Sequence, residues 1–389
     1  MTHSPTSLRW SLILLIAGLI AAGLHSRGTI EPRFSIANPI DAHEKEIVQP
    51  LFSPIELPRP EISAHASSMA FLPDGTLLVS WFGGSREGAD DIAIWMARVK
   101  DGRTQDSWIA LTCKQLEGLT HRVIRTLGNP VVWIDTKGDV RLHVVSVSYG
   151  GWAGSSINQL RSEDGGKSWS EAQRLILSPF FNLSTLVRNQ VVAMEDGTIG
   201  LPAYHEFLHK WGIWVRFTTE GRVLQCERMP SDIGQLLQPA VIATSATDAL
   251  AVLRNTNSSQ PVIGRSATKD GGQSWSLMAP LEIPNPNSSA CMIRLRDGSV
   301  LIAANPLANG RNILQLFRSR DGGTSWEASR IIERGEKGSE FSYPSFAQSA
   351  EGMIYLSYTW QRKGIRLCAF NAAWLDAGGN DNAAMESAP

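Results

Sequence analysis

Short apolar segments, each preceded by a polar turn, recur along most of the chain. From Ile62 onwards, six turns rich in Asp and Gly lead into strand-forming residues, as in Pro73-Asp74-Gly75-Thr76-Leu77-Leu78-Val79. The other five turns lie at 137–139, 195–197, 247–249, 296–298 and 351–352. Their spacing of roughly 50 to 60 residues is typical of β-propellers, whose repeats carry four short strands. The pattern therefore predicts an all-β fold, a six-bladed β-propeller.

A second motif keeps the same period. Ser162-Glu163-Asp164-Gly165-Gly166-Lys167-Ser168-Trp169 recurs with small changes at 268–275 and 319–326, and degenerate copies stand at 100–102 and 218–221. An Asp that accepts bonds from backbone amides, two glycines and a Ser predict a tight turn between antiparallel strands. The Trp is expected to anchor that turn by burying its ring. We expect these turns at the periphery of the blades, away from the central channel.

The last repeat is too short for a complete blade. Residues 341–375 hold fewer strand-forming segments than the other repeats, so the segment before Ile62 is expected to supply the missing strand. That pairing would close the ring and remove an open sheet edge. A β-sandwich is the alternative architecture, but it would not explain two motifs that share one period.

Composition and charge narrow the possible functions. The 389 residues include 34 Gly and 13 Trp, and the formal net charge is −1 with no long run of Lys or Arg. A chain of this kind is not expected to bind nucleic acid. The four cysteines lie far apart, which favours scattered thiols over pairing. No metal-like spacing, phosphate loop or nucleotide fingerprint occurs, so no metal or cofactor is predicted.

The N-terminus carries an export signal. Residues 10–24 form an apolar run preceded by Arg9, which predicts a signal peptide or an N-terminal membrane anchor over residues 1–27. Either alternative places the body in the periplasm or another extracytoplasmic space, with membrane contact only through this segment. Residues 28–60 are expected to form a linker or strap, residues 61–375 the propeller, and residues 376–389 a disordered tail.

Two arginines occupy similar places in consecutive repeats. Arg254 and Arg311 each follow an apolar segment and precede a copy of the Asp-Gly-Gly motif. Inner strands of a propeller converge on the central channel, so both side chains could reach one concave site. A guanidinium group matches a carboxylate with two parallel hydrogen bonds, which indicates an acidic ligand. The alternative is a pair of ordinary surface arginines.

The Asp-Gly-Gly motif resembles the Asp-box of the sialidase (neuraminidase) superfamily with BNR repeats. The chain from about Glu61 to Leu375 looks most like the bacterial branch of predicted neuraminidases. The resemblance implies a six-bladed propeller, three arginines that grip a sugar carboxylate, an Asp as general acid and base, and a Tyr nucleophile activated by a Glu. It also implies that the partner is an acidic glycan or polysaccharide.

Four residues match this pattern. By the resemblance, Arg254 and Arg311 are the second and third arginines, and Tyr343 is the nucleophile. Asp90 is matched to the acid and base, although spacing does not exclude Asp91. Arg86, in the same Gly-rich stretch, could add positive charge.

Two other positions depart from the pattern. His65 stands where the family has the first arginine, and Gln238 stands where it has the activating Glu. Since Gln cannot take a proton, Glu206 or Glu340 would have to act as a substitute base. His65 and His205 also make a lyase conceivable, in which a Tyr or His removes the proton next to a uronate carboxylate.

Three hypotheses follow from these residues. The first is an exo-glycosidase that hydrolyses a terminal acidic sugar, sialic acid or a relative. The second is a polysaccharide lyase for uronate-containing glycans, and the third is a propeller that binds an acidic glycan without turning it over.

Overall fold

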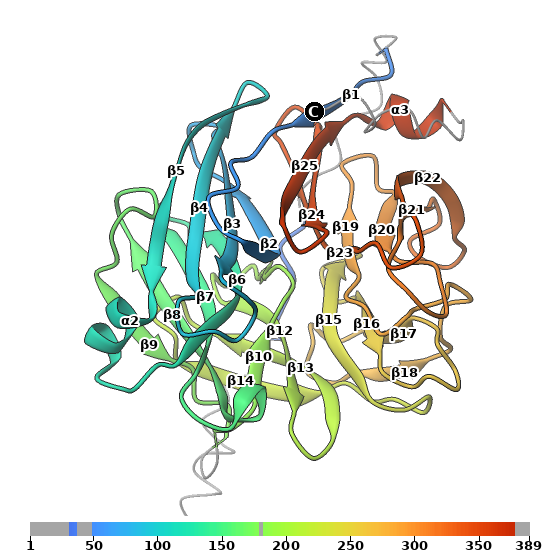
Figure 1. Ribbon diagram of the computed structural model, residues 1–389. Coiled ribbons are helices and arrows are strands. Elements are labelled where there is room, and N and C mark those ends of the chain that lie inside the picture. Colours follow the sequence, from blue (N-terminus) through green and yellow to red (C-terminus); the bar gives the residue numbers. More distant parts are fainter. Residues whose placement is uncertain (1–30, 37–48, 179–181, 378–389) are drawn as a thin grey trace, which may run out of the picture.

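Six antiparallel sheets surround a central axis in the computed structural model (Figure 1). The structure describes residues 31–36, 49–178 and 182–377. The first blade contains β2 (Ser63–Phe71), β3 (Leu77–Gly84), β4 (Ala93–Lys100) and β5 (Arg103–Thr112). The second contains β6 (Thr126–Ile134), β7 (Val140–Val147), β8 (Ser155–Ser162) and β9 (Glu171–Arg174). The third contains β10 (Thr185–Val187), β11 (Val192–Ala193), β12 (Ile199–Glu206), β13 (Lys210–Phe217) and β14 (Val223–Arg228).

The remaining blades follow the same order from the channel outwards. The fourth contains β15 (Leu236–Ala243), β16 (Ala249–Asn255), β17 (Gly264–Thr268) and β18 (Ser276–Met278). The fifth contains β19 (Cys291–Arg294), β20 (Val300–Ala304), β21 (Ile313–Ser319) and β22 (Glu327–Arg334). The sixth contains β23 (Phe341–Gln348), β24 (Ile354–Trp360), β25 (Gly364–Phe370) and β1 (Phe52–Ile55). Helix α2 (Cys113–Thr120) and the 3-10 turn η1 (Gly151–Gly154) lie in connections between strands, and helix α3 (Ala372–Asp376) follows β25. The predicted six-bladed propeller is confirmed.

The ring is closed by a strand from before the first blade. β1 pairs antiparallel with β25, with Phe52 opposite Phe370 and Ile55 opposite Leu367, and Figure 1 shows the two side by side. The Phe52 ring also lies 4.8 Å from the Trp374 ring of α3. The expectation that the segment before Ile62 completes the last blade is therefore confirmed, and this pairing covers the outer edge of β25.

The Asp-boxes join the third and fourth strands of their blades. In the second blade, the Asp164 carboxylate accepts hydrogen bonds from the backbone N–H of Lys167 and from both the N–H and the hydroxyl of Ser168. Both glycines of the box have positive φ, as the turn requires. Trp169 donates from Nε1 to the Ala110 carbonyl of the preceding blade at 2.7 Å, so the box also ties neighbouring blades together.

Each innermost strand starts at one end of its blade, and the chain reverses direction at every turn. The boxes, between the third and fourth strands, therefore lie at the other end, called here the box end. The degenerate copies at 100–102 and 218–221 occupy the same place, between β4 and β5 and between β13 and β14. The expected position away from the channel is confirmed.

Part of the predicted strap also lies at the box end. Phe34 is buried, donates its backbone N–H to the Ala246 carbonyl and meets the Trp214 ring edge-on at 5.8 Å. Among the described residues, no helix is both long enough and apolar enough to cross a membrane. The apolar run at 10–24 lies outside them, as does the tail from residue 378.

All four cysteines are free thiols. Cys291 and Cys368 are buried, Cys113 is part-buried and Cys226 is exposed. They are thus scattered rather than paired.

Candidate active site

Irregularities in the innermost strands shape one end of the channel. The antiparallel register shifts near Asn129 in β6, Gln238 in β15 and Tyr343 in β23, and each of these residues has a positive φ and precedes a Pro. Ala66 holds the corresponding place in β2. A positive φ is a costly conformation for a bulky aromatic residue, worth about 1–3 kcal/mol, and such strain gathers at functional sites.

Tyr343 lies at the centre of this end of the channel and is 8% exposed. Its hydroxyl oxygen accepts hydrogen bonds from Arg254 Nη1 at 2.8 Å and from Gln238 Nε2 at 3.4 Å. Burial raises the pKa of Tyr343, but the charges of Arg254 and Arg311 and the Gln238 hydrogen bond outweigh it and bring the pKa below its usual value. The surroundings therefore make the phenol proton of Tyr343 easier to remove than that of an ordinary tyrosine.

Asn287 holds both predicted arginines beside Tyr343. Arg254 Nε donates to Asn287 Oδ1 at 2.7 Å, and Arg311 Nη2 donates to the Asn287 carbonyl at 2.9 Å. The Arg311 guanidinium lies 5.7 Å from the centre of the Tyr343 ring. Gln238 Oε1 accepts from Arg254 at 3.2 Å, so this amide orients the arginine as well as the tyrosine.

A further arginine underlies the site. Arg188 is 1% exposed and donates to the carbonyls of Ser67 and Pro344, both at 3.0 Å, and to that of Tyr343. Its guanidinium lies 5.2 Å from the centre of the Tyr343 ring. Burial lowers the pKa of Arg188, and in the described part of the chain no carboxylate forms an ion pair with it. This buried cation adds to the positive character of the site.

His65 packs against the nucleophile candidate, but it does not replace the charge of an arginine. Its ring centre is 4.1 Å from that of Tyr343, and Nδ1 is hydrogen-bonded to Thr359 Oγ1 at 2.9 Å. Burial, followed by the charges of nearby arginines of which Arg362 is the strongest, holds the pKa of His65 well below its usual value. The imidazole is therefore neutral near pH 7 and is a weak base.

Arg362 brings a cation beside His65 from the last blade. It lies in the turn between β24 and β25, where Gln361 and Arg362 both have positive φ. Its carbonyl accepts from Ala64 N–H at 2.9 Å, and its guanidinium pairs with Glu340 at 2.9 Å and with Glu87. Two consecutive residues with positive φ are typical of a tight hairpin turn, and here the turn consists of non-glycine residues, which adds strain.

Glu340 joins the arginines instead of contacting Tyr343. Its carboxylate accepts from Arg311 at 2.9 Å, from Arg362 at 2.9 Å and from the Ser342 hydroxyl at 2.6 Å. Burial raises the pKa of Glu340, but the hydrogen bonds from Arg362 and Ser342 and the charge of Arg311 bring it below its usual value. Glu340 is thus an ionised carboxylate that orients two guanidinium groups.

The other two candidates for acid or base chemistry in the third blade lie further out. Glu206, at the end of β12, pairs with Lys210 at 3.3 Å, and its charge acts on Arg254 and on Tyr204. The His205 ring stacks on Trp211 at 4.2 Å, and burial lowers its pKa. Within the described residues, neither forms a hydrogen bond with Tyr343.

Asp90 and Arg86 are exposed in the loop between β3 and β4. This loop follows the second strand of the blade. Asp91 is held within the loop, because its carboxylate accepts from the N–H and the hydroxyl of Ser85 at 3.0 and 2.9 Å. Glu87 of the same loop pairs with Arg362, which places the loop beside the site.

Sequence reasoning missed several residues of this site. Tyr204 accepts hydrogen bonds from Gln238 Nε2 at 3.3 Å and from Asn129 Nδ2 at 3.2 Å, and burial raises its pKa, so it stays protonated. Asn129 is followed by a Pro, as Gln238 and Tyr343 are. This shared signal could have identified Asn129 from the sequence. Arg188, Asn287 and Arg362 lie outside the repeated pattern and leave no comparable signal.

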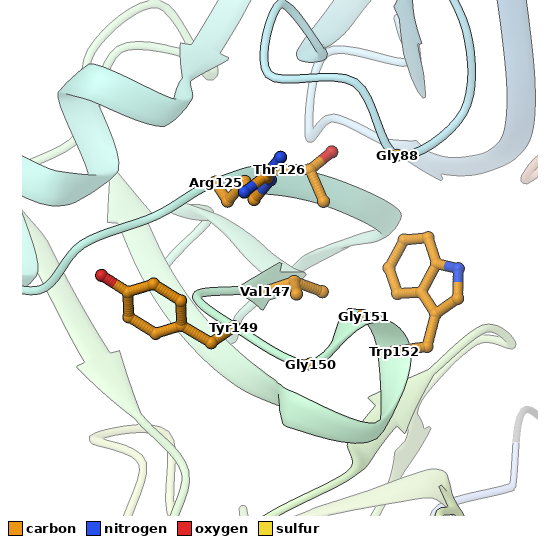
Figure 2. Close-up of a pocket in the computed structure, with 8 residues that line it drawn as sticks. All are labelled: Gly88, Arg125, Thr126, Val147, Tyr149, Gly150, Gly151 and Trp152. Carbon is orange, nitrogen blue, oxygen red and sulfur yellow. The ribbon is translucent and has the colours of Figure 1, made fainter.

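A pocket of about 240 Å³ opens between the first two blades at the same end of the propeller (Figure 2). Trp152 packs so closely on the strand that a Cβ on Gly128 would lie 2.6 Å from its ring. Gly88 of this pocket follows Glu87, which pairs with Arg362, so the pocket lies beside the Tyr343 site. The pocket is lined by Gly88, Arg125, Thr126, Val147, Tyr149, Gly150, Gly151 and Trp152. No cluster of three or more potential metal ligands is found in residues 31–36, 49–178 and 182–377.

Six blades, Asp-box turns and neighbouring structures define a β-propeller of the sialidase-like class. Residues 75–356 match the model of the BNR repeat-like domain, and the chain belongs to this family. A comparison with curated proteins gave no match.

Solved structures of low sequence identity share the fold. The Hadza microbial sialidase Hz136 is 17% identical with a TM-score of 0.65, over 82% of this chain and 66% of its own length. The NanB sialidase from Streptococcus pneumoniae is 12% identical with a TM-score of 0.65, over 85% of this chain and 72% of its own. An α-L-arabinanase from Penicillium chrysogenum, solved with arabinobiose, is 13% identical with a TM-score of 0.61, over 83% of this chain and 97% of its own length. These neighbours include enzymes named for different sugars.

Proposed function

We propose that the protein is an exo-glycosidase that hydrolyses a terminal acidic sugar, sialic acid or a relative, with retention of configuration. The observation that carries this proposal is the Tyr343 hydroxyl, which accepts hydrogen bonds from Arg254 and Gln238 at 2.8 and 3.4 Å. The sialidases among the structural neighbours support the choice of an acidic sugar.

Arg254 and Arg311 would bind the carboxylate of the sugar. Arg254 Nη2 and Arg311 Nε make no hydrogen bond within the described part of the chain, so each guanidinium keeps a free donor. Arg362 would supply the third cation, in place of the arginine that His65 replaces. Ionised Glu340 orients Arg311 and Arg362, which limits the entropy lost when the sugar binds.

Tyr343 would act as the nucleophile without a neighbouring carboxylate base. Because Arg254 and Arg311 favour the phenolate, the phenol can lose its proton to water before the sugar reacts. The phenolate oxygen then bonds to the anomeric carbon, while the departing glycosidic oxygen takes a proton from Asp90. Water next attacks the same carbon, Asp90 takes its proton, and Tyr343 leaves as phenolate.

The test is release of free sialic acid from sialyllactoses of both common linkages. We expect release by the wild-type protein and a loss of roughly a hundredfold or more in Tyr343→Phe, because the nucleophilic oxygen is removed. Tyr355→Phe is the matched control, since Tyr355 lies in β24 and packs on Phe71, near the box end of the blade. Failure to release sialic acid from any sialoside would overturn the proposal.

A non-catalytic acidic-glycan receptor is the second candidate. Gln238 favours it, because no carboxylate among the described residues is hydrogen-bonded to Tyr343. In that case Arg254→Ala abolishes sugar binding while the wild-type protein turns nothing over. We do not propose the lyase reaction, since the lowered pKa of His65 makes it a weak base for removing a proton next to a carboxylate.

Export remains part of the proposal, on the strength of the apolar run at 10–24. Fractionation of cells that express the full chain measures it, and recovery only from the cytoplasm would contradict it.

A further inference from the structure

A second pocket adjoins the one in Figure 2 at the same end of the propeller. It has a volume of about 270 Å³ and is bounded by β7–β9 and by the segments that precede β6 and β10. Tyr149 lines both pockets. The two cavities are therefore neighbours, and the inner one lies beside the Tyr343 site, because its Gly88 follows Glu87, the ion-pair partner of Arg362.

Three arginines line these cavities without a carboxylate partner. Arg125 lines the inner pocket, and Arg122 and Arg174 line the outer one. Among the described residues none of the three takes part in an ion pair, and no acidic side chain lines either pocket. Burial lowers the pKa of Arg174, and the positive charge of Arg122 lowers it further. These two cations therefore repel each other. An approaching anion would relieve that repulsion.

Polar groups in both pockets are left without partners. Arg174 donates from Nη2 to the Asn182 carbonyl at 2.7 Å, but its buried Nε has no hydrogen-bond partner in the structure. The buried Thr126 hydroxyl, in the inner pocket, also has none. Unsatisfied polar groups in a cavity wall are costly unless water or a ligand meets them.

Aromatic rings flank the inner pocket. Tyr149 is 71% exposed, and the turn at Gly150 and Gly151, both with positive φ, separates it from Trp152. In Figure 2 the two rings lie on opposite sides of this turn, with Arg125 and Thr126 across the pocket from it. An exposed Tyr ring and a half-buried Trp ring next to cations suit a ligand with both apolar ring faces and acidic groups, such as a chain of acidic sugars.

We propose that the two pockets form a secondary site for further acidic sugars of an oligosaccharide whose terminal unit occupies the Tyr343 site. This inference rests on the proposed function and narrows its substrate class. The preferred substrate is then a chain that carries a carboxylate on successive sugars, and not a neutral glycan capped by one acidic unit.

The test compares monomers with trimers in the full-length Tyr343→Phe protein, so that turnover does not interfere. The probes are N-acetylneuraminic acid and its α2,8-linked trimer, and galacturonic acid and its α1,4-linked trimer, with calorimetric binding as the readout. One trimer series should bind at least about tenfold tighter than its monomer, because two further sugars gain charge-assisted hydrogen bonds. Arg122→Glu should remove most of that advantage and leave monomer affinity unchanged.

Arg103→Glu is the matched control, because Arg103 is exposed at the start of β5, near the opposite end of the propeller. It changes the net charge equally and should keep the trimer advantage. Equal affinities for monomer and trimer in both series would overturn the secondary site. An equal loss of the trimer advantage in Arg103→Glu and Arg122→Glu would also overturn it, because the effect would then come from the net charge of the protein and not from Arg122 in the pocket.

Failure of the secondary-site proposal can be distinguished from failure of the glycosidase proposal. If the wild-type protein hydrolyses sialyllactose but no trimer is preferred, only the secondary site is wrong. If no sialoside is turned over while a trimer advantage depends on Arg122, the secondary site stands and the hydrolysis proposal falls.

Discussion

Charge decides the chemistry of Tyr343 at the scale of single residues. Burial raises the pKa of most of the tyrosines in this chain, as it does for Tyr204 and Tyr358. Tyr343 is also buried, but its hydroxyl oxygen accepts a hydrogen bond from Arg254, and its pKa moves the other way. The Arg254 guanidinium thus makes the Tyr343 phenol easier to deprotonate, which in the proposed reaction takes the place of a carboxylate base.

We predict that Arg254→Gln raises the pKa of Tyr343. Titration of the near-ultraviolet phenolate absorbance should show one group below the usual range near 10 in the wild-type protein. That group should be absent in Tyr343→Phe and shifted upwards in Arg254→Gln, because the cation that stabilises the phenolate is gone. Arg103→Gln is the control, and identical titrations of wild-type and Arg254→Gln would contradict the account.

The same substitution should move the pH dependence of turnover. In the proposed reaction the phenolate attacks, so the rate should rise as pH increases towards the pKa of Tyr343. A higher pKa should then move this ascending limb to higher pH. Values of kcat/KM across pH measure the effect.

The turns that stabilise the blades and the residues of the candidate site lie in different parts of the fold. The Asp-box hairpins lie at one end of the blades, whereas Tyr343, Gln238 and the arginines gather at the other. A turn at the box end can therefore lose its hydrogen bonds without disturbing the site.

We predict that Asp270→Ala lowers the free energy of unfolding by about 1–2 kcal/mol and leaves kcat/KM unchanged. The Asp270 carboxylate accepts from the Ser274 N–H and hydroxyl and from the Thr268 hydroxyl, and the substitution removes all three bonds at a part-exposed site. Denaturant unfolding and an activity assay measure the two quantities. Lys269→Ala, at the exposed neighbouring position, is the control, and a large loss of activity in Asp270→Ala would contradict the separation.

The repeats explain how far sequence alone could reach at this scale. Turns with one period predicted the blades, the closing strand and one concave site that Arg254 and Arg311 could both reach. Tyr343 was added to that site only by the resemblance to sialidases. The sequence named His205 as a site residue and missed its neighbour Tyr204. Neighbouring residues of β12 point to opposite faces of the sheet, so Tyr204 contacts Gln238 whereas His205 stacks on Trp211. Arg362 was not predicted, because a loop carries it and its place depends on packing between the last and first blades.

Closure of the ring and burial between blades set the stability of the whole molecule. His143 is an example in the second blade, where it accepts from Trp133 Nε1 at 3.2 Å and is hydrogen-bonded to Gln159 at 3.1 Å. Burial lowers the pKa of His143 to about 4. The unfolded chain protonates this residue near pH 6.5, so the folded state loses stability as pH falls from about 6.5 to 4.

We predict that His143→Gln loses less stability than the wild type over this pH range, by up to about 3 kcal/mol. Glu61, whose pKa burial raises to about 7, has the opposite effect, so only the difference between variants isolates His143. Denaturant unfolding at several pH values measures it, with the exposed His209→Gln as control. Parallel curves for wild type and His143→Gln would contradict the prediction.

The most direct test of the central claim is the mass of the protein after reaction with a fluorinated sialic acid analogue that slows breakdown of a glycosyl-enzyme intermediate. We expect one added sugar on the peptide that contains Tyr343, and no addition in Tyr343→Phe. Release of sialic acid from a substrate without any adduct on Tyr343, or an adduct on another residue, would contradict it.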